Sequence, residues 1–158
     1  MIGWKFGTDV VATDKGDTMK FIVFVHPGDK EGYKAGKMPD EKALEAMTKY
    51  NEELVNAGVM LGGEGVHPDT DATRIHFSGA DKMTITDGPF TQTGEVIGGF
   101  WVWQVKSKAE AVEWAKRAPM EVGATLEIRQ CFEPEDFGPE IAARERAMIE
   151  KIEKQQNR

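Results

Sequence analysis

The strand signal at residues 100–105 limits the possible folds of this chain more than any other stretch. Phe100 and Val102 fall on one side of such a strand, because successive side chains alternate between the two faces. Trp101 and Trp103 fall on the other side, so neither side is polar. A strand that is apolar on both sides needs cover on both faces. The sheet that contains it must therefore pack against other structure on both of its faces.

Two polar or flexible features precede this strand. Asp87-Gly88-Pro89 predicts a tight turn, because glycine tolerates a positive φ, proline fixes its own φ, and aspartate can accept hydrogen bonds from nearby backbone. Gly98 and Gly99 lead into the strand, and such glycines mark a bulge or a close approach by a ligand or another backbone. A structural loop explains both features. They also make Asp87, Gly98 and Gly99 candidate site residues.

Composition excludes several classes of protein. The 158 residues carry a formal net charge of −7, which argues against binding to nucleic acid or to an anionic membrane surface. The single cysteine, Cys131, excludes a disulfide framework within the chain, and a cytoplasmic location fits best. No run approaches the roughly 18 apolar residues of a membrane span. We therefore expect no membrane association and no secretory signal.

The order of the predicted elements indicates the fold. Strands are predicted at residues 20–25, 59–65, 73–78, 83–86, 100–105 and 125–132, and helices at residues 40–57, 107–118 and 139–156, with a polar loop at 29–38. Two strand–helix–strand halves around a mostly antiparallel sheet predict a ferredoxin-like α+β domain. We assign residues 1–18 to an N-terminal extension, 19–133 to the α+β domain and 134–158 to a C-terminal helical extension.

Two apolar surfaces predict contacts beyond this domain. Both helices of a ferredoxin-like unit cover the same sheet face, so the other face would expose a large apolar patch, which monomers rarely do. We therefore expect a two-fold homodimer with its sheets face to face. The C-terminal helix carries a narrow apolar stripe, formed by Ile141, Met148, Ile149 and Ile152. Such a stripe is typical of a helix that docks on a core or on a partner.

Histidines and arginines supply further candidate site residues. His26 ends the first strand and His67 follows a glycine-rich bend. Strand ends and glycine-rich bends tend to lie together at one end of a sheet, where pockets form. Each of these two histidines could equally be a surface imidazole. Arg74 and Arg129 could hold an anionic ligand, or could simply form ion pairs, for instance with Glu127 or Glu64.

The sequence predicts neither a metal nor a cofactor. His67, Asp69 and Asp71 have a loose metal-ligand spacing, but no second histidine stands near them at a zinc-motif spacing. No phosphate-binding loop, dinucleotide fingerprint or nucleophile elbow occurs in the chain. We therefore expect no metal site and no cofactor.

Several short motifs occur together between residues 19 and 132. They are Gly62-Gly63-Glu64-Gly65, Thr86-Asp87-Gly88-Pro89-Phe90, Ile97-Gly98-Gly99-Phe100, Trp114-Ala115-Lys116-Arg117-Ala118-Pro119 and Glu127-Ile128-Arg129. Their order and spacing resemble those of the YCII-related family, in its branch known for the Asp-Gly-Pro-Phe motif, the DGPF-domain branch. The resemblance implies a dimeric α+β barrel built from ferredoxin-like subunits.

The resemblance also bears on function. Some relatives in this superfamily are enzymes that act on small cyclic or aromatic molecules, including a dehydrochlorinase, and typical members have a His–Asp pair proposed as an acid–base dyad. Asp87 matches the acidic position. The histidine usually lies in the first helix, where this chain has none and where counting back from Gly58 leads to Met47. Genes of the branch often lie beside those of alternative sigma factors.

Two classes of function therefore remain, and the sequence leaves open whether the protein is an enzyme. In the first, it is a small-molecule-binding or enzyme-like dimeric α+β barrel with a pocket near the Asp87 turn. In the alternative, it is a non-catalytic accessory or regulatory protein associated with an alternative sigma factor system. Its dimer surface and C-terminal helix would then contact a protein partner in transcription regulation.

Overall fold

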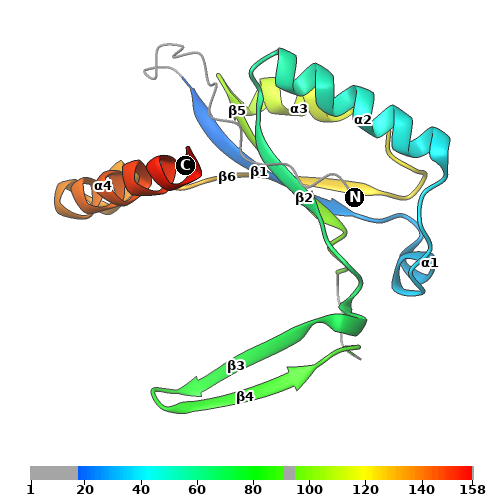
Figure 1. Ribbon diagram of the computed structural model, residues 1–158, viewed down its shortest axis with the longest axis horizontal. Helices are drawn as coiled ribbons and strands as arrows, with labels where there is room; N and C mark the ends of the chain where they lie inside the picture. The colour runs from blue at the N-terminus through cyan, green and yellow to red at the C-terminus, as the bar shows by residue number, and fades with distance from the viewer. Residues whose placement is uncertain (1–17, 91–94, 158) are drawn as a thin grey trace.

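A computed structural model describes residues 18–90 and 95–157 of the chain (Figure 1). The strands are β1 (Met19–His26), β2 (Met60–Gly65), β3 (Thr73–Gly79), β4 (Lys82–Asp87), β5 (Gly99–Val105) and β6 (Thr125–Gln130). The helices are α1 (Lys30–Lys34), α2 (Glu41–Asn56), α3 (Lys108–Lys116) and α4 (Pro139–Gln156), with short 3-10 turns η1 (Asp69–Asp71) and η2 (Pro134–Phe137). The N-terminal extension expected at residues 1–18 lies almost wholly outside the described residues.

The main sheet has four antiparallel strands in the order β2-β5-β1-β6. Val23 of β1 lies between Trp101 of β5 and Ile128 of β6, which fixes the register at the centre of the sheet. Helices α2 and α3 lie together on one face of this sheet (Figure 1). The predicted ferredoxin-like α+β architecture with an added C-terminal helix is therefore confirmed.

The two covering helices begin where local sequence signals place them. The Asp40 carboxylate accepts a hydrogen bond from the Ala43 N–H at 2.8 Å and caps α2. Ser107 caps α3 in the same way, because its hydroxyl accepts a hydrogen bond from the Glu110 N–H at 3.1 Å. The Glu110 carboxylate in turn accepts a hydrogen bond from the Lys106 N–H, one residue before the cap.

The core lies between the sheet and these helices. Trp103, Phe21, Leu54 and Val23 are its largest fully buried side chains. Tyr50, Trp101 and Trp103 bring polar atoms into this core. Those of Tyr50 and Trp101 have partners, whereas the buried Trp103 indole N–H has none among the described residues. The Trp101 indole N–H donates to the Asn51 side-chain oxygen at 3.0 Å, and the Tyr50 hydroxyl donates to the Trp114 carbonyl at 2.7 Å.

Removing the Tyr50 hydroxyl should destabilise the fold by about 1 kcal/mol at neutral pH, because Tyr50→Phe leaves the Trp114 carbonyl without its donor. Burial raises the pKa of Tyr50 to about 12, so the folded state favours the neutral phenol. The stability contributed by that preference is complete below about pH 10, the ordinary tyrosine pKa, and is lost as pH rises towards 12. Urea unfolding of both proteins should therefore show a difference that shrinks above pH 10, whereas a constant difference would contradict the assignment.

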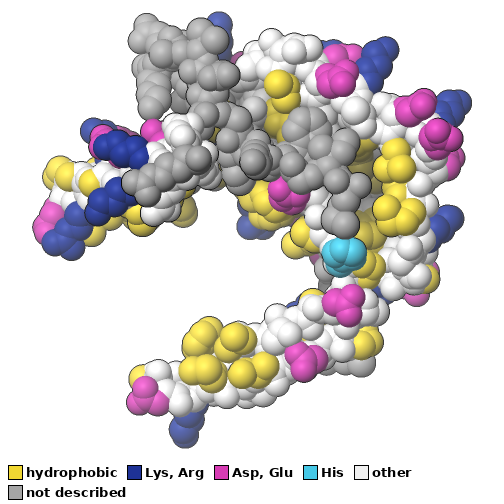
Figure 2. Space-filling model, in the orientation of Figure 1, with side chains coloured by type: hydrophobic (Ala, Val, Ile, Leu, Met, Phe, Trp, Pro, Cys, Tyr) yellow, Lys and Arg dark blue, Asp and Glu magenta, His cyan; other side chains and the backbone are white. Residues whose placement is uncertain are grey.

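Strands β3 and β4 form a separate two-stranded hairpin that projects away from the main sheet (Figure 1). Its apolar side chains gather on one face, because Ile75 pairs with Ile85 and Phe77 pairs with Met83. All four are more than half exposed, and they form a clear patch on the hairpin in Figure 2. An isolated hairpin is marginally stable in water at best. This apolar face is therefore exposed on the described part of the chain.

Helix α4 leaves its apolar stripe exposed on the described part of its own chain. Only Ala142 is buried, in the region where α4 begins beside η2. The predicted stripe of Ile141, Met148, Ile149 and Ile152 is between 37% and 51% exposed, so it does not dock on the core of the same subunit. Docking on a partner stays a prediction. Within residues 18–90 and 95–157, no helix has both the length and the apolar character needed to cross a membrane.

Candidate functional site

The most unusual polar side chain in the described chain is that of His26, at the end of β1. His26 is only 8% exposed. Phe21 and Val23 of the same strand face the helices, so the alternation of side chains places His26 on the sheet face opposite α2 and α3. A buried imidazole on the face that no helix of the same domain covers has no packing role in the main core.

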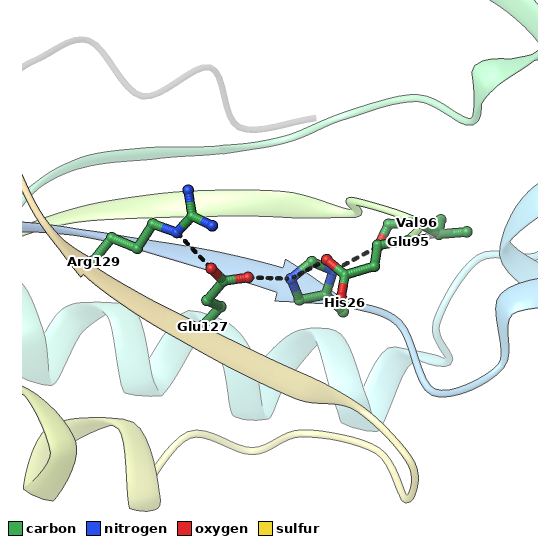
Figure 3. A network of polar contacts seen from close by, with 5 residues as sticks. All are labelled: His26, Glu95, Val96, Glu127 and Arg129. Carbon is green, nitrogen blue, oxygen red and sulfur yellow. Dashed lines mark hydrogen bonds and ion pairs between the residues drawn. The ribbon is translucent and has the colours of Figure 1, made fainter. Parts of the chain in front are cut away.

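The hydrogen bonding of His26 defines the role of each ring nitrogen. Nδ1 lies 3.0 Å from the Val96 carbonyl oxygen, and because a carbonyl only accepts, Nδ1 must donate (Figure 3). Nε2 is buried and has no hydrogen-bond partner among the described residues. In the neutral ring, Nε2 therefore carries a free lone pair.

Two carboxylates face this nitrogen from different elements (Figure 3). Glu127 of β6 places Oε2 at 3.5 Å from His26 Nε2, and Glu95, which lies in the segment before β5, places Oε2 at 4.0 Å. The other oxygen of Glu127 accepts a hydrogen bond from Arg129 Nε at 2.5 Å. That hydrogen bond is the main cause that lowers the pKa of Glu127, and His26 lowers it further when its ring is protonated. The Glu127 carboxylate is therefore ionised at neutral pH.

These groups border a hollow of about 250 Å³ at the edge of the sheet. It is lined by His26, Pro27, Lys30, Glu95, Gly123, Thr125, Leu126 and Glu127. The wall formed by the loop before β6 is held close to the end of β1, because the Glu121 carboxylate accepts hydrogen bonds from the Gly28 and Asp29 N–H groups at 2.8 and 3.1 Å. A Cβ atom on Gly28 would lie 2.3 Å from the Val122 carbonyl oxygen, so only glycine permits this approach.

The arrangement can hold a small ligand through two kinds of contact. The Nε2 lone pair and the free oxygens of Glu95 and Glu127 attract hydrogen-bond donors or cations. Lys30, which also lines the hollow, can pair with a negatively charged group. The hollow therefore suits a small polar molecule rather than an extended apolar one.

Asp87 does not line this hollow. It is exposed at the end of β4, where its carboxylate accepts a hydrogen bond from the Thr73 hydroxyl at 2.7 Å. The backbone of the following turn is held by other groups. The Phe90 N–H donates to the Asp69 carboxylate at 3.1 Å, and the Gly88 N–H donates to the Ala72 carbonyl at 2.7 Å. Asp87 thus joins the two ends of the hairpin.

Gly98 and Gly99, the glycines named as site candidates, leave room for neighbouring backbone segments of the same chain. Gly98 donates to the Val25 carbonyl and accepts from the Val66 N–H, so both of its backbone groups serve neighbouring segments. A Cβ atom on Gly99 would lie 2.6 Å from the Glu64 carbonyl oxygen of β2. The close approach predicted from these glycines is therefore made by another part of the chain.

The remaining candidates divide between the hollow and the hairpin. Arg129 belongs to the His26 group through Glu127, as its ion-pair interpretation predicted. The Arg74 guanidinium lies 3.8 Å from the centre of the Phe90 ring, and His67 is exposed after β2. Sequence reasoning missed Glu95 as a site residue, because nothing in its local pattern shows that its segment returns to the end of β1.

Replacing Asp87 by asparagine should cost about 1 kcal/mol of stability and leave ligand binding at the hollow unchanged, because its contact is with Thr73 at the base of the hairpin. Thr73→Val is the matched variant, since it removes the hydroxyl donor of the hydrogen bond that asparagine, as a neutral acceptor, only weakens. Urea unfolding of both single variants and the double variant should show that the losses do not add. Loss of ligand binding in Asp87→Asn at unchanged stability would instead assign Asp87 to the binding site.

Comparisons with known proteins bear on the whole of this α+β region. No curated protein sequence matches the chain. The family model for the YCII-related domain matches residues 19–133, from the start of β1 to the residue before η2. The match covers more than half of the chain and includes every strand of the main sheet and both covering helices. The chain therefore belongs to the YCII-related family.

Proposed function

We propose that this protein binds a small molecule in an enzyme-like manner in the hollow at His26. The observation that carries the proposal is the buried Nε2 atom, which has no hydrogen-bond partner among the described residues and faces two carboxylates. Buried polar atoms nearly always have a partner, so this nitrogen is suited to bind one that the described residues do not supply. Our sequence hypothesis put the pocket near the Asp87 turn, whereas the hollow that supports the proposal borders His26.

Three finer assignments accompany this proposal. The motif Asp87-Gly88-Pro89-Phe90 supports membership in the DGPF-domain branch, and its glycine is constrained, since a Cβ atom there would lie 1.6 Å from the Asp69 carbonyl oxygen.

The single cysteine, Cys131, supports a cytoplasmic location. Burial raises the pKa of the Cys131 thiol, which fits a structural cysteine and not a reactive one.

We also propose that the protein acts as a homodimer. Cross-strand pairs of apolar residues, Ile22 with Val102 and Phe24 with Phe100, lie on the sheet face that α2 and α3 leave open. A second copy that covers this face would also stand over the side of the sheet on which His26 lies. The binding hollow would then lie beside the subunit interface.

A thermal-shift screen of small polar molecules tests the binding proposal. Ligands that raise the melting temperature of the wild type should fail to raise that of His26→Gln, which removes the Nε2 lone pair. His67→Gln is the matched control, because His67 is exposed and does not line the hollow. If the shifts survive in His26→Gln, or disappear equally in His67→Gln, the hollow is not the binding site.

The exposed stripe on α4 supports a second candidate function, that of an accessory protein in an alternative sigma factor system. Four apolar side chains in a line on an exposed helix suit a protein partner. The double variant Ile149→Ser/Ile152→Ser should keep the melting temperature of the isolated protein, because both side chains are more than a third exposed. It should lose binding to a purified alternative sigma factor, and retention of that binding by the variant would exclude the stripe as the contact.

A further inference from the structure

We propose that His26, Glu95 and Glu127 together bind one divalent transition-metal cation, and that Zn²⁺ fits the site best. The inference rests on the proposed function for its location, since both use the hollow at His26. It deepens that function by naming what anchors the small molecule. The three residues come from β1, from the segment before β5 and from β6, so only the folded chain brings them together.

The distances between the three side chains suit a metal ion. One ligand atom from each residue lies within 4.8 Å of the other two. Bonds of about 2.0–2.2 Å from zinc to imidazole nitrogen and carboxylate oxygen place two ligands about 3.3–3.5 Å apart at a tetrahedral angle. His26 Nε2 and Glu127 Oε2 are 3.5 Å apart, so they match that spacing. Glu95, whose side chain is 72% exposed, can rotate to shorten its 4.0 Å distance from Nε2.

Contacts behind the ligands hold them in the orientation that metal binding needs. Metal-binding histidines usually donate their second ring N–H to a carbonyl or carboxylate, and His26 Nδ1 donates to the Val96 carbonyl. Glu127 is held through Oε1 by Arg129, which leaves Oε2 facing the imidazole. The buried Nε2 atom, without a hydrogen-bond partner among the described residues, is an independent indication that the group binds something more than its own carboxylates.

The donor set also indicates the class of metal. One imidazole nitrogen with carboxylate oxygens favours first-row transition metals such as Zn²⁺ over Ca²⁺ and Mg²⁺, which prefer oxygen ligands alone. Three protein ligands leave at least one coordination position for water or for a small molecule. Lys30 lines the same hollow, and its charge opposes a bare cation but favours an anionic ligand on the metal. The expected small molecule is therefore a compact anion with an oxygen donor.

Titration calorimetry of the metal-free protein with Zn²⁺ tests the site directly. We expect one Zn²⁺ ion to bind per chain. The absorption spectrum of the protein loaded with Co²⁺ in place of Zn²⁺ should indicate a low coordination number with one nitrogen ligand. His26→Gln and Glu127→Gln should each weaken binding more than about tenfold, since even outer contacts of metal ligands contribute tenfold or more. His67→Gln, the matched control, should bind as the wild type does. Absence of Zn²⁺ binding, or binding that His26→Gln leaves unchanged, would overturn the proposal.

Two further comparisons keep the result interpretable. Glu95→Gln alters an exposed side chain, so it should weaken Zn²⁺ binding without disturbing the fold even if His26→Gln proves unstable. The small-molecule screen is run on metal-free and on Zn²⁺-loaded protein. Small-molecule binding that depends on His26 in protein that takes up no Zn²⁺ would reject the metal and keep the proposed function. Zn²⁺ binding at His26 without any small-molecule hit in either form would support the metal and reject the proposed function.

Discussion

Light scattering of the wild-type protein at micromolar concentration should give twice the 17.6 kDa mass of the chain, and Val102→Asp should give the mass of a single chain. Val102 lies beside Ile22 on the open face of the sheet, the face proposed to meet a second copy. An aspartate there would be solvated in the monomer. In the dimer it would be a buried, unpaired charge, which costs several kcal/mol.

A matched control separates this effect from a general effect of added charge. Val122→Asp makes the same substitution at a fully exposed valine in the loop before β6. That variant should keep the mass of the wild type. If the wild type scatters as a monomer, the proposed homodimer is wrong. If Val102→Asp stays dimeric, the interface lies elsewhere.

Trp103→Ala should lower the free energy of unfolding by about 3–5 kcal/mol, the usual cost of emptying a large buried aromatic site. Trp103 is fully buried, and in the sheet it pairs with Phe21 of β1 on one side and with Met60 of β2 on the other. Its removal therefore leaves a cavity in the core between the sheet and the helices that cover it. Urea unfolding followed by circular dichroism gives the difference.

The control for Trp103→Ala is Met38→Ala, at a side chain that is 74% exposed, where the change should stay within about 0.5 kcal/mol. A loss of 3–5 kcal/mol is a large part of the stability of an ordinary domain, so the alanine variant can fall below the limit for folding. Trp103→Phe then supplies a smaller, measurable loss. A cost under about 1 kcal/mol for Trp103→Ala would contradict the assignment of this residue to the core.

The sequence predicts the architecture well because its signals are local. Asp40 and Ser107 cap their helices through residues only three positions away, and the alternation in β5 shows directly which side chains share a face. The segment at residues 29–38 is harder, because its polar, glycine-rich sequence predicts a loop where α1 forms one short turn. The Asp29 carboxylate accepts a hydrogen bond from the Gly32 N–H, which starts that turn and lowers the pKa of Asp29.

The candidate site is less predictable because its geometry depends on long-range register. His26 could be named from its place at a strand end, but Glu127 reaches it only because β6 pairs with β1. The Asp-Gly-Pro turn shows the same limit. Asp87 was expected to accept backbone N–H bonds of its own turn, whereas Asp69, eighteen residues earlier, accepts the Phe90 N–H. Local sequence cannot show which of two nearby carboxylates the folded hairpin brings to that donor.

Nitrogen NMR of the three histidine rings in mildly alkaline solution tests most directly whether His26 is built to bind a ligand. The account predicts that His26 carries its proton on Nδ1, bonded to the Val96 carbonyl, and that its Nε2 signal shifts when Zn²⁺ or a small-molecule hit is added. The signals of His67 and His76 should stay in place. A proton on His26 Nε2, or ligand-induced shifts confined to His67 or His76, would contradict the central claim.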